Sequence, residues 1–233
     1  MLSSKALYKY KKNYKIKNLS FNSEVDPLDL KKYEYRAKTV RLRWAEQVVK
    51  ILDELNFFKK KVIINDLGCN WFQFYKELKL KKKKVDYFGY DYDKKFINIG
   101  LKYFPELKKK YKIANIESTK IRASDLNIAS IVLDHLEKPK KFLSKFFKSR
   151  KLVVLRCYLG GKDLVYLFSN KKLVEKPYFI NQFSFENIIR IFHKNKFTPT
   201  FYLDKATKLS KEHEISKNYN VYRKIFIIIG SKY

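Results

Sequence analysis

The chain has 233 residues, 45% hydrophobic content and a formal net charge of +30. This length suffices for one α/β domain with a full core, and no apolar run approaches the roughly 20 residues of a membrane span. Two cysteines, Cys69 and Cys157, support neither a disulfide framework nor a zinc site. We therefore expect a cytoplasmic, reduced protein without a signal peptide, without a membrane span and without a bound metal.

The positive charge has two open interpretations. It can reflect a surface that attracts nucleic acid or anionic membrane. It can also reflect composition, because Lys, Asn, Ile, Tyr and Phe are all abundant and only eight basic residues are Arg. Arg is the usual choice for bidentate phosphate or base contacts. Residues 1–26, where six Lys occur within the first 23 positions and no acid does, predict a basic, mobile arm or a polyanion-binding arm.

A helix is expected to begin at Asp26-Pro27-Leu28-Asp29, with Asp as N-cap and Pro at the first helical position. The helical spacing of the apolar residues that follow extends it over 27–57, in one or two pieces. These residues predict one buried face: Val40, Trp44, Val48, Ile51, Leu52 and Leu55.

The most informative stretch runs from Val62 to Asp91. A short β-branched strand stops at Asn65-Asp66, a turn containing Gly68 leads into a helix over 71–80, and a second strand ends at Asp91. Strand, glycine turn, helix, strand and acid follow the order of a nucleotide-binding βαβ unit. In such a unit the glycine lets backbone N–H groups approach a ligand, and the carboxylate can accept two ribose hydroxyls.

The remaining pattern predicts an alternation of helices and strands within one domain over 27–233. Expected helices are 94–103, 139–148 and 185–196, the last capped by Ser184 after a loop over 177–184. Expected strands are 111–117, 126–130, 151–159, 198–204 and 221–230, with a charged loop between the last two.

Two groups of residues carry a family resemblance. Asp66-Leu67-Gly68-Cys69 with Gly89-Tyr90-Asp91-Tyr92-Asp93, and later Asp125 with Leu133-Asp134-His135-Leu136, resemble motifs of the class I S-adenosylmethionine-dependent methyltransferases, in their small-molecule branch. The resemblance covers most of the chain from about residue 35. It implies an α/β, Rossmann-like fold with a mostly parallel seven-stranded sheet, helices on both faces and an antiparallel last strand. The stretch 177–184 is also similar to bacterial methyltransferases linked to surface-polysaccharide synthesis.

The resemblance also implies roles for individual residues. The turn and the strand end before it would hold the methionine part of S-adenosylmethionine, Asp91 would accept its ribose hydroxyls, and Tyr92 would pack on adenine. Asn115 and Ile116 stand where the family usually has an acid and a hydrophobic residue beside adenine. The full expected cofactor set is Asp66, Gly68, Cys69, Asn70, Asp91, Tyr92, Asn115, Ile116 and Ser130.

Catalysis of methyl transfer needs alignment and sometimes a base. His135 is the first candidate for the base and Asp134 a weaker one, with a structural histidine as the alternative. Many family members have a second glycine at the position of Asn70, so the cofactor site could be degenerate. Three hypotheses stay open: methylation of a hydroxyl, amine or carboxylate on a small molecule or sugar; methylation of RNA; or a non-enzymatic binding protein. The oligomeric state is equally open.

Overall fold

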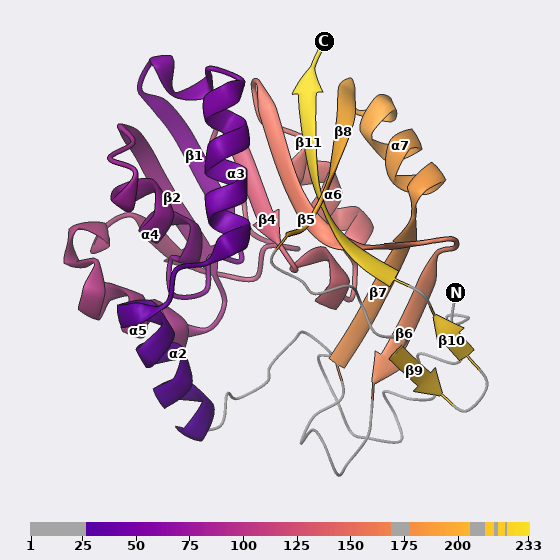
Figure 1. The fold of residues 1–233 in the computed structure, drawn as a ribbon, viewed down its shortest axis with the longest axis horizontal. Helices are drawn as coiled ribbons and strands as arrows, with labels where there is room; N and C mark the ends of the chain where they lie inside the picture. The colour runs from indigo at the N-terminus through magenta and orange to yellow at the C-terminus, as the bar shows by residue number, and fades with distance from the viewer. Residues whose placement is uncertain (1–26, 169–177, 206–212, 217–218, 222) are drawn as a thin grey trace.

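The computed structural model describes residues 27–168, 178–205, 213–216, 219–221 and 223–233. Its centre is a sheet whose seven main strands follow the order β3-β2-β1-β4-β5-β11-β8 (Figure 1). The strands are β1 (Val62–Leu67), β2 (Val85–Asp91), β3 (Tyr111–Ile113), β4 (Leu126–Ser130), β5 (Leu152–Gly160), β8 (Phe197–Leu203) and β11 (Arg223–Lys232). β11 runs antiparallel to both of its neighbours, and the others run parallel to one another. The predicted fold class is confirmed.

Two strands extend the sheet beyond this order. β6 (Leu164–Phe168) and β7 (Tyr178–Ser184) form an antiparallel pair, and the end of β7 pairs with the end of β5 through Leu159↔Phe183 and Gly160↔Ser184. The loop predicted over 177–184 is therefore wrong from residue 178 onwards. The polar residues in this stretch suggested a loop, whereas pairing with β6 and β5 makes it a strand. A separate hairpin, β9 (His213–Ser216) and β10 (Tyr219–Val221), lies within the predicted charged loop.

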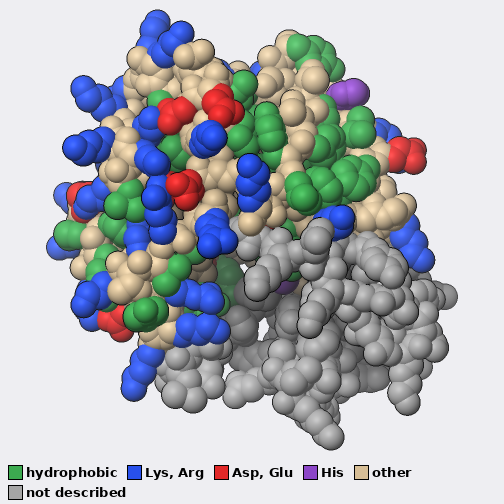
Figure 2. Space-filling model, in the orientation of Figure 1, with side chains coloured by type: hydrophobic (Ala, Val, Ile, Leu, Met, Phe, Trp, Pro, Cys, Tyr) green, Lys and Arg blue, Asp and Glu red, His purple; other side chains and the backbone are tan. Residues whose placement is uncertain are grey.

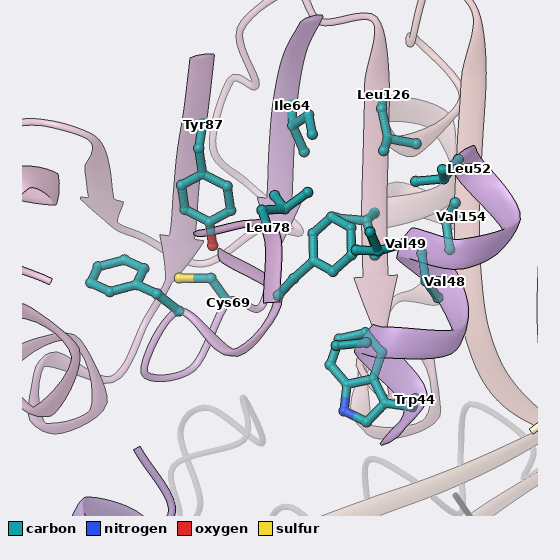
Figure 3. Packing of buried hydrophobic residues seen from close by; sticks show 14 of the residues in the cluster. Trp44, Val48, Val49, Leu52, Ile64, Cys69, Leu78, Tyr87, Leu126 and Val154 are labelled. Atoms are coloured by element: carbon teal, nitrogen blue, oxygen red, sulfur yellow. The ribbon is translucent and has the colours of Figure 1, made fainter. Parts of the chain in front are cut away.

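Helices cover both faces of the sheet. One face carries α2 (Pro27–Thr39), α3 (Arg43–Glu54), α4 (Gln73–Leu80) and α5 (Lys94–Tyr103), and the other carries α6 (Pro139–Phe146) and α7 (Phe185–Lys194). Figure 3 shows side chains of α3 that point at the sheet, where Ile64, Leu126 and Val154 meet them. All three are almost fully buried, as expected for a sheet covered on both faces.

The N-terminal helical segment is in two pieces. The break between α2 and α3 is held by α4, because Nζ of Lys76 donates to the carbonyl oxygens of Arg36, Ala37 and Val40 at 3.3, 2.8 and 3.0 Å. These are carbonyls at the end of α2, where a cation is favourable. Lys76 thus fixes α2 against the helix that follows the glycine turn.

Element ends differ from the expected ones by a few residues. β3 stops at Ile113 rather than residue 117, because the N–H groups of Ser118 and Thr119 turn back to the carbonyl of Asn115. The N-cap of α7 is confirmed: Oγ of Ser184 accepts the N–H of Asn187 at 3.1 Å. Within the described ranges, no helix combines the length and apolar character needed to span a membrane. The predicted arm, 1–26, lies outside these ranges.

Candidate functional site

The glycine turn follows β1 at the carboxyl edge of the sheet, the edge where ligands bind in open α/β folds. The N–H groups of Gly68 and Cys69 both donate to the carbonyl of Tyr90, at 2.7 and 3.0 Å, and so tie the turn to β2. Gly68 has φ +81°, and a Cβ there would clash with Val132 in the loop after β4. Only glycine allows this combination of backbone angle and close approach.

Two further residues of the turn have left-handed backbone angles without being glycine. They are Asn70, with φ 52°, and Phe72, with φ 63°. Oδ1 of Asn70 accepts the N–H of Trp71 at 2.9 Å, which is how a short polar side chain stabilises this conformation. Phe72 is fully buried, and its ring occupies the space that a side chain on Gly89 or Gly100 would need. The missing glycine at position 70 therefore leaves the turn intact.

Asp91 lies at the end of β2, directly beside this turn. One carboxylate oxygen accepts the N–H of Asn70 at 2.7 Å, and the other accepts the N–H of Asp93 at 3.0 Å. Burial raises the pKa of Asp91 to about 6, although both hydrogen bonds act to lower it. Each oxygen keeps a further lone pair, so the side chain can still accept hydroxyl groups.

Asp66 is the second buried acid of the turn. It is 3% exposed, and Oδ2 accepts the hydroxyl of Tyr87 at 2.7 Å. Burial raises its pKa to about 7, the Tyr87 hydrogen bond opposes that rise, and the negative charge of Asp91 adds to it. A positive charge close to Asp66 would favour its ionised form and so lower this raised pKa.

The other expected cofactor residues surround the same edge. The thiol of Cys69 is buried, and burial raises its pKa. The contribution of Cys69 to the turn is its backbone N–H, which donates to the carbonyl of Tyr90. Asn115 is exposed after β3, and its Oδ1 accepts the N–H of Glu117 at 2.7 Å. Ile116 is 7% exposed and packs in the core with Leu67. Ser130 ends β4, and half-buried Tyr92 follows Asp91.

The two candidate catalytic residues lie in a short 3-10 turn, η3 (Leu133–His135), after β4. Asp134 is fully buried, and its Oδ1 accepts the N–H of Tyr158 on β5 at 2.9 Å. It fills the gap along β5 between the end of β4 and the end of β7. This geometry gives Asp134 a structural role in placing the residue that follows it.

His135 is half-buried, and its Nδ1 lies 2.8 Å from the carbonyl oxygen of Phe179 on β7. A carbonyl oxygen only accepts, so Nδ1 carries the hydrogen and neutral His135 has its lone pair on Nε2. The ring is thus held in the tautomer that a general base acting through Nε2 requires.

Two amide residues on β7 complete the surroundings of η3 and were missed in the sequence. Nδ2 of Asn181 donates to the carbonyls of Leu133 and Leu136, at 3.1 and 2.8 Å, and so clamps both ends of η3. Gln182 lies over Gly160, where any side chain would clash with its amide. Its Nε2 donates to the carbonyl of Lys162 at 2.8 Å. In the sequence, the only feature that could have indicated these two residues is that they are adjacent amides between apolar residues.

These two amides share an unusual feature. Oδ1 of Asn181 and Oε1 of Gln182 are buried and have no hydrogen-bond partner among the residues described. The carbonyl partners of their nitrogen atoms fix which end of each amide is oxygen. A buried acceptor without a donor costs about 1–3 kcal/mol, so such atoms call for an explanation, and a bound ligand supplies one.

A buried ion pair lies on the helix-α3 side of the same edge. Nε and Nη2 of Arg156 contact Oδ2 of Asp204 at 3.0 and 2.6 Å, and Nη1 lies 3.3 Å from Oγ of Ser130. The guanidinium also stacks over Trp44, 5.5 Å from the ring centre. This network ties Ser130, at the end of β4, to Arg156 on β5 and to Asp204 after β8.

Comparisons by sequence return nothing: no family model matches the chain, and no curated protein matches it. Comparison of structures returns many proteins. Magnesium protoporphyrin IX methyltransferase from Synechocystis, with bound SAM, is 13% identical, with a TM-score of 0.55, covering 99% of this chain and 92% of that one. A Burkholderia thailandensis 1,6-didemethyltoxoflavin-N1-methyltransferase with S-adenosylhomocysteine is 10% identical, with a TM-score of 0.57, covering 88% and 86%.

A third similar structure is a phosphoethanolamine-type N-methyltransferase from Haemonchus contortus, in complex with phosphomonomethylethanolamine and S-adenosylhomocysteine. It is 13% identical, with a TM-score of 0.65, over 93% of this chain and 61% of that one. The similarity to polysaccharide-associated methyltransferases stays a prediction. At these identities the comparisons establish the architecture. The chain has the fold of the class I S-adenosylmethionine-dependent methyltransferases.

Proposed function

We propose that this protein is an S-adenosylmethionine-dependent methyltransferase that methylates a small molecule or sugar. One observation carries the proposal. In a fold shared with S-adenosylmethionine-dependent enzymes, Gly68 and Asp91 meet at the carboxyl ends of adjacent strands, with the turn's backbone tied to β2. This is the arrangement expected of a nucleoside-binding turn.

The residues present fit the cofactor. Asp91 would accept the ribose hydroxyls through its remaining lone pairs, and Asn115 would accept the adenine amine in the same way. Asp66, whose pKa burial raises to about 7, would gain from the positive charge of the methionine part. Nε1 of Trp71, in the same turn, is a buried donor without a partner among the described residues. When bound, the cofactor supplies an electrophilic methyl group on a sulfonium.

Within this proposal His135 is the general base. Phe179 holds Nδ1–H, so Nε2 is the atom that takes a proton from the acceptor as its oxygen or nitrogen is methylated. Asp134 and Asn181 are positioning residues, because they fix η3 to β5 and β7.

The oxygen atoms of β7 that have no partner in the described part of the chain restrict which chemical group of the methyl acceptor can lie beside them. Oε1 of Gln182 can only accept a hydrogen bond, and Nε2 is already engaged with Lys162. A ligand that carries O–H or N–H groups would satisfy it, whereas a carboxylate would bring a second acceptor against it. The structure therefore favours a hydroxyl or an amine over a carboxylate as the group next to β7.

The test is transfer of a labelled methyl group from S-adenosylmethionine to matched acceptors that differ only in carrying an alcohol, an amine or a carboxylate, with sugars included. We expect transfer to alcohols or amines. In His135→Asn, kcat should fall by roughly 10²–10⁴ near neutral pH, with S-adenosylhomocysteine binding kept. His193→Asn is the matched control, because His193 is exposed at the end of α7. Absence of both cofactor binding and transfer would refute the proposal and favour a non-enzymatic fold.

A further inference from the structure

The parallel strands place the segments that lead into them on one edge of the sheet, opposite the candidate site. We call it the amino edge. We count 59–61, 81–84, 108–110, 148–151 and 194–196, together with 231–233 at the end of antiparallel β11. Ser124 and Asp125, which lead into β4 on the same edge, are buried and are not counted. These segments hold sixteen Lys or Arg residues and no acid. Acids of adjoining elements pair with three of the lysines: Asp53 with Lys83, Asp86 with Lys110 and Asp125 with Lys151. All of the sixteen except Lys83 are exposed. Figure 2 shows blue side chains along the upper left margin, over the amino ends of β1 and β2, with red ones near the top of α3 and further blue ones down the left side of this face.

The opposite edge has a different charge. The described segments that follow the strands there hold three Lys and six acids, counted over 68–72, 92–93, 114–117, 131–138, 161–163 and 204–205. A basic composition spread evenly over the surface would make both edges positive. Among the segments counted here, the positive charge is instead concentrated at the amino edge.

Exposed apolar side chains accompany the lysines at the amino edge. The prediction that Leu55 lies on the buried helix face is wrong, because α3 ends at Glu54 and Leu55 is 48% exposed. Leu80 ends α4 and is 55% exposed, and Tyr233 is 71% exposed. The N–H of Tyr233 donates to the carbonyl of Lys196, which places the last residue on this edge. Three large apolar groups thus stand among cations whose stems are themselves apolar.

We propose that the amino edge docks on an anionic lipid membrane surface. Diffuse negative charge suits Lys, a point charge without the planar geometry that bidentate phosphate or base contacts use. Fifteen of the sixteen cations are Lys, and Arg150 is the exception. Leu55 and Leu80, unlike Tyr233, offer no stacking surface to nucleic-acid bases, but they suit insertion among lipid headgroups. The seven strand ends from β3 to β8 span about 29 Å at the usual strand spacing, so many cations can reach one flat surface.

Docking in this way leaves the carboxyl edge facing away from the lipid. The candidate cofactor turn and η3 lie there, so a soluble acceptor reaches them without crossing the docked surface. The proposal is independent of the methyltransferase activity, because no residue of the amino edge belongs to the candidate site.

The experiment is vesicle flotation of the full chain with phosphatidylcholine vesicles, with and without about one third phosphatidylglycerol. We expect binding only to the anionic vesicles, falling steeply with added salt. The test variant carries Lys60→Glu, Lys81→Glu and Lys84→Glu. Each lost Lys should weaken binding about fivefold, so the three together should weaken it by at least roughly a hundredfold.

The matched control makes the same change of charge on α2, as Lys31→Glu, Lys32→Glu and Lys38→Glu. Its affinity for anionic vesicles should stay within a few-fold of that of the wild-type protein, since α2 lies outside the amino edge. Thermal unfolding checks that both variants are folded. Equal losses in the two variants would show a non-specific effect of net charge and overturn the proposal.

A second variant tests the apolar part. Leu55→Ser with Leu80→Ser leaves the charge unchanged and should weaken vesicle binding by about tenfold or more. Binding of an oligouridylate probe serves as the comparison for nucleic acid. Three results together would identify nucleic acid as the partner. The Leu variant would keep full vesicle binding, the oligonucleotide would bind the wild-type protein more tightly than the vesicles do, and the amino-edge Lys variant would lose affinity for the oligonucleotide. The membrane proposal would then be wrong.

Discussion

Replacement of Asp66 by Asn should change how stability depends on pH. Asp66 is buried beside Asp91 and has its pKa raised from 3.8 to about 7. A raised pKa means that the folded protein prefers the neutral acid, so the contribution is fully present below about pH 4 and is lost as pH rises through about 7. Asn keeps an oxygen that can accept the hydroxyl of Tyr87 but cannot ionise.

The magnitude follows from the shift. Between pH 5 and pH 7 the wild-type protein should lose about 3 kcal/mol through Asp66, at about 1.4 kcal/mol per pH unit. The loss ends near pH 7, where the folded state also ionises. In Asp66→Asn this contribution is absent, so the stability of the variant relative to wild type should rise by about that amount between pH 5 and pH 8.

Urea unfolding from pH 5 to pH 8, without ligand, measures this difference. Other titrating groups act in both proteins, so the change in slope between the two isolates Asp66. Parallel pH profiles of the two proteins, or a lower stability of Asp66→Asn relative to wild type at pH 8 than at pH 5, would contradict the raised pKa of Asp66.

Three further changes probe the site's framework. Gly68→Ala should cost about 3 kcal/mol in urea unfolding, from the left-handed backbone angle and the clash with Val132; a cost below about 1 kcal/mol would contradict the described turn. Asn70→Gly should change stability by less than about 1 kcal/mol and keep cofactor affinity, since Asn70 already adopts φ 52°; a large loss of binding would show that its side chain contacts the ligand. Asn181→Leu should cost about 2–4 kcal/mol by stranding the carbonyls of Leu133 and Leu136, and an unchanged midpoint in urea would exclude the clamp.

The architecture followed from local patterns. The β-branched run at Val62, the glycine at position 68 and the acid at position 91 predict strand, turn and strand end without knowledge of any distant partner. Periodic apolar residues predicted α3 for the same reason, since Trp44, Val48 and Leu52 repeat at helical spacing and are buried.

The acceptor side of the site could not be predicted, because its structure depends on long-range contacts. Asn181 and Gln182 lie in a strand only because β6 and the end of β5 pair with it. The position of Asp134 depends on the N–H of Tyr158, 24 residues later. Nothing in the local sequence around either residue specifies those partners.

Asn70 is a second position where the local sequence was not sufficient to predict the structure. The sequence pattern suggested a weakened turn because a glycine is missing. The structure keeps the left-handed angle through a hydrogen bond to the neighbouring residue and accommodates buried Phe72 against Gly89 and Gly100. A family pattern states which residue is usual, whereas side-chain packing decides whether another one fits.

Calorimetric titration with S-adenosylhomocysteine tests the central claim most directly, with NAD as the control ligand and Asp91→Ala as the variant. We expect S-adenosylhomocysteine to bind the wild-type protein and NAD not to bind. In Asp91→Ala, binding of S-adenosylhomocysteine should be at least roughly a hundredfold weaker, because two charge-assisted hydrogen bonds to the ribose are lost. Thermal unfolding confirms that the variant is folded. Equal affinity in the two proteins, or no binding to a folded wild-type chain, would contradict the claim that this edge is a cofactor site.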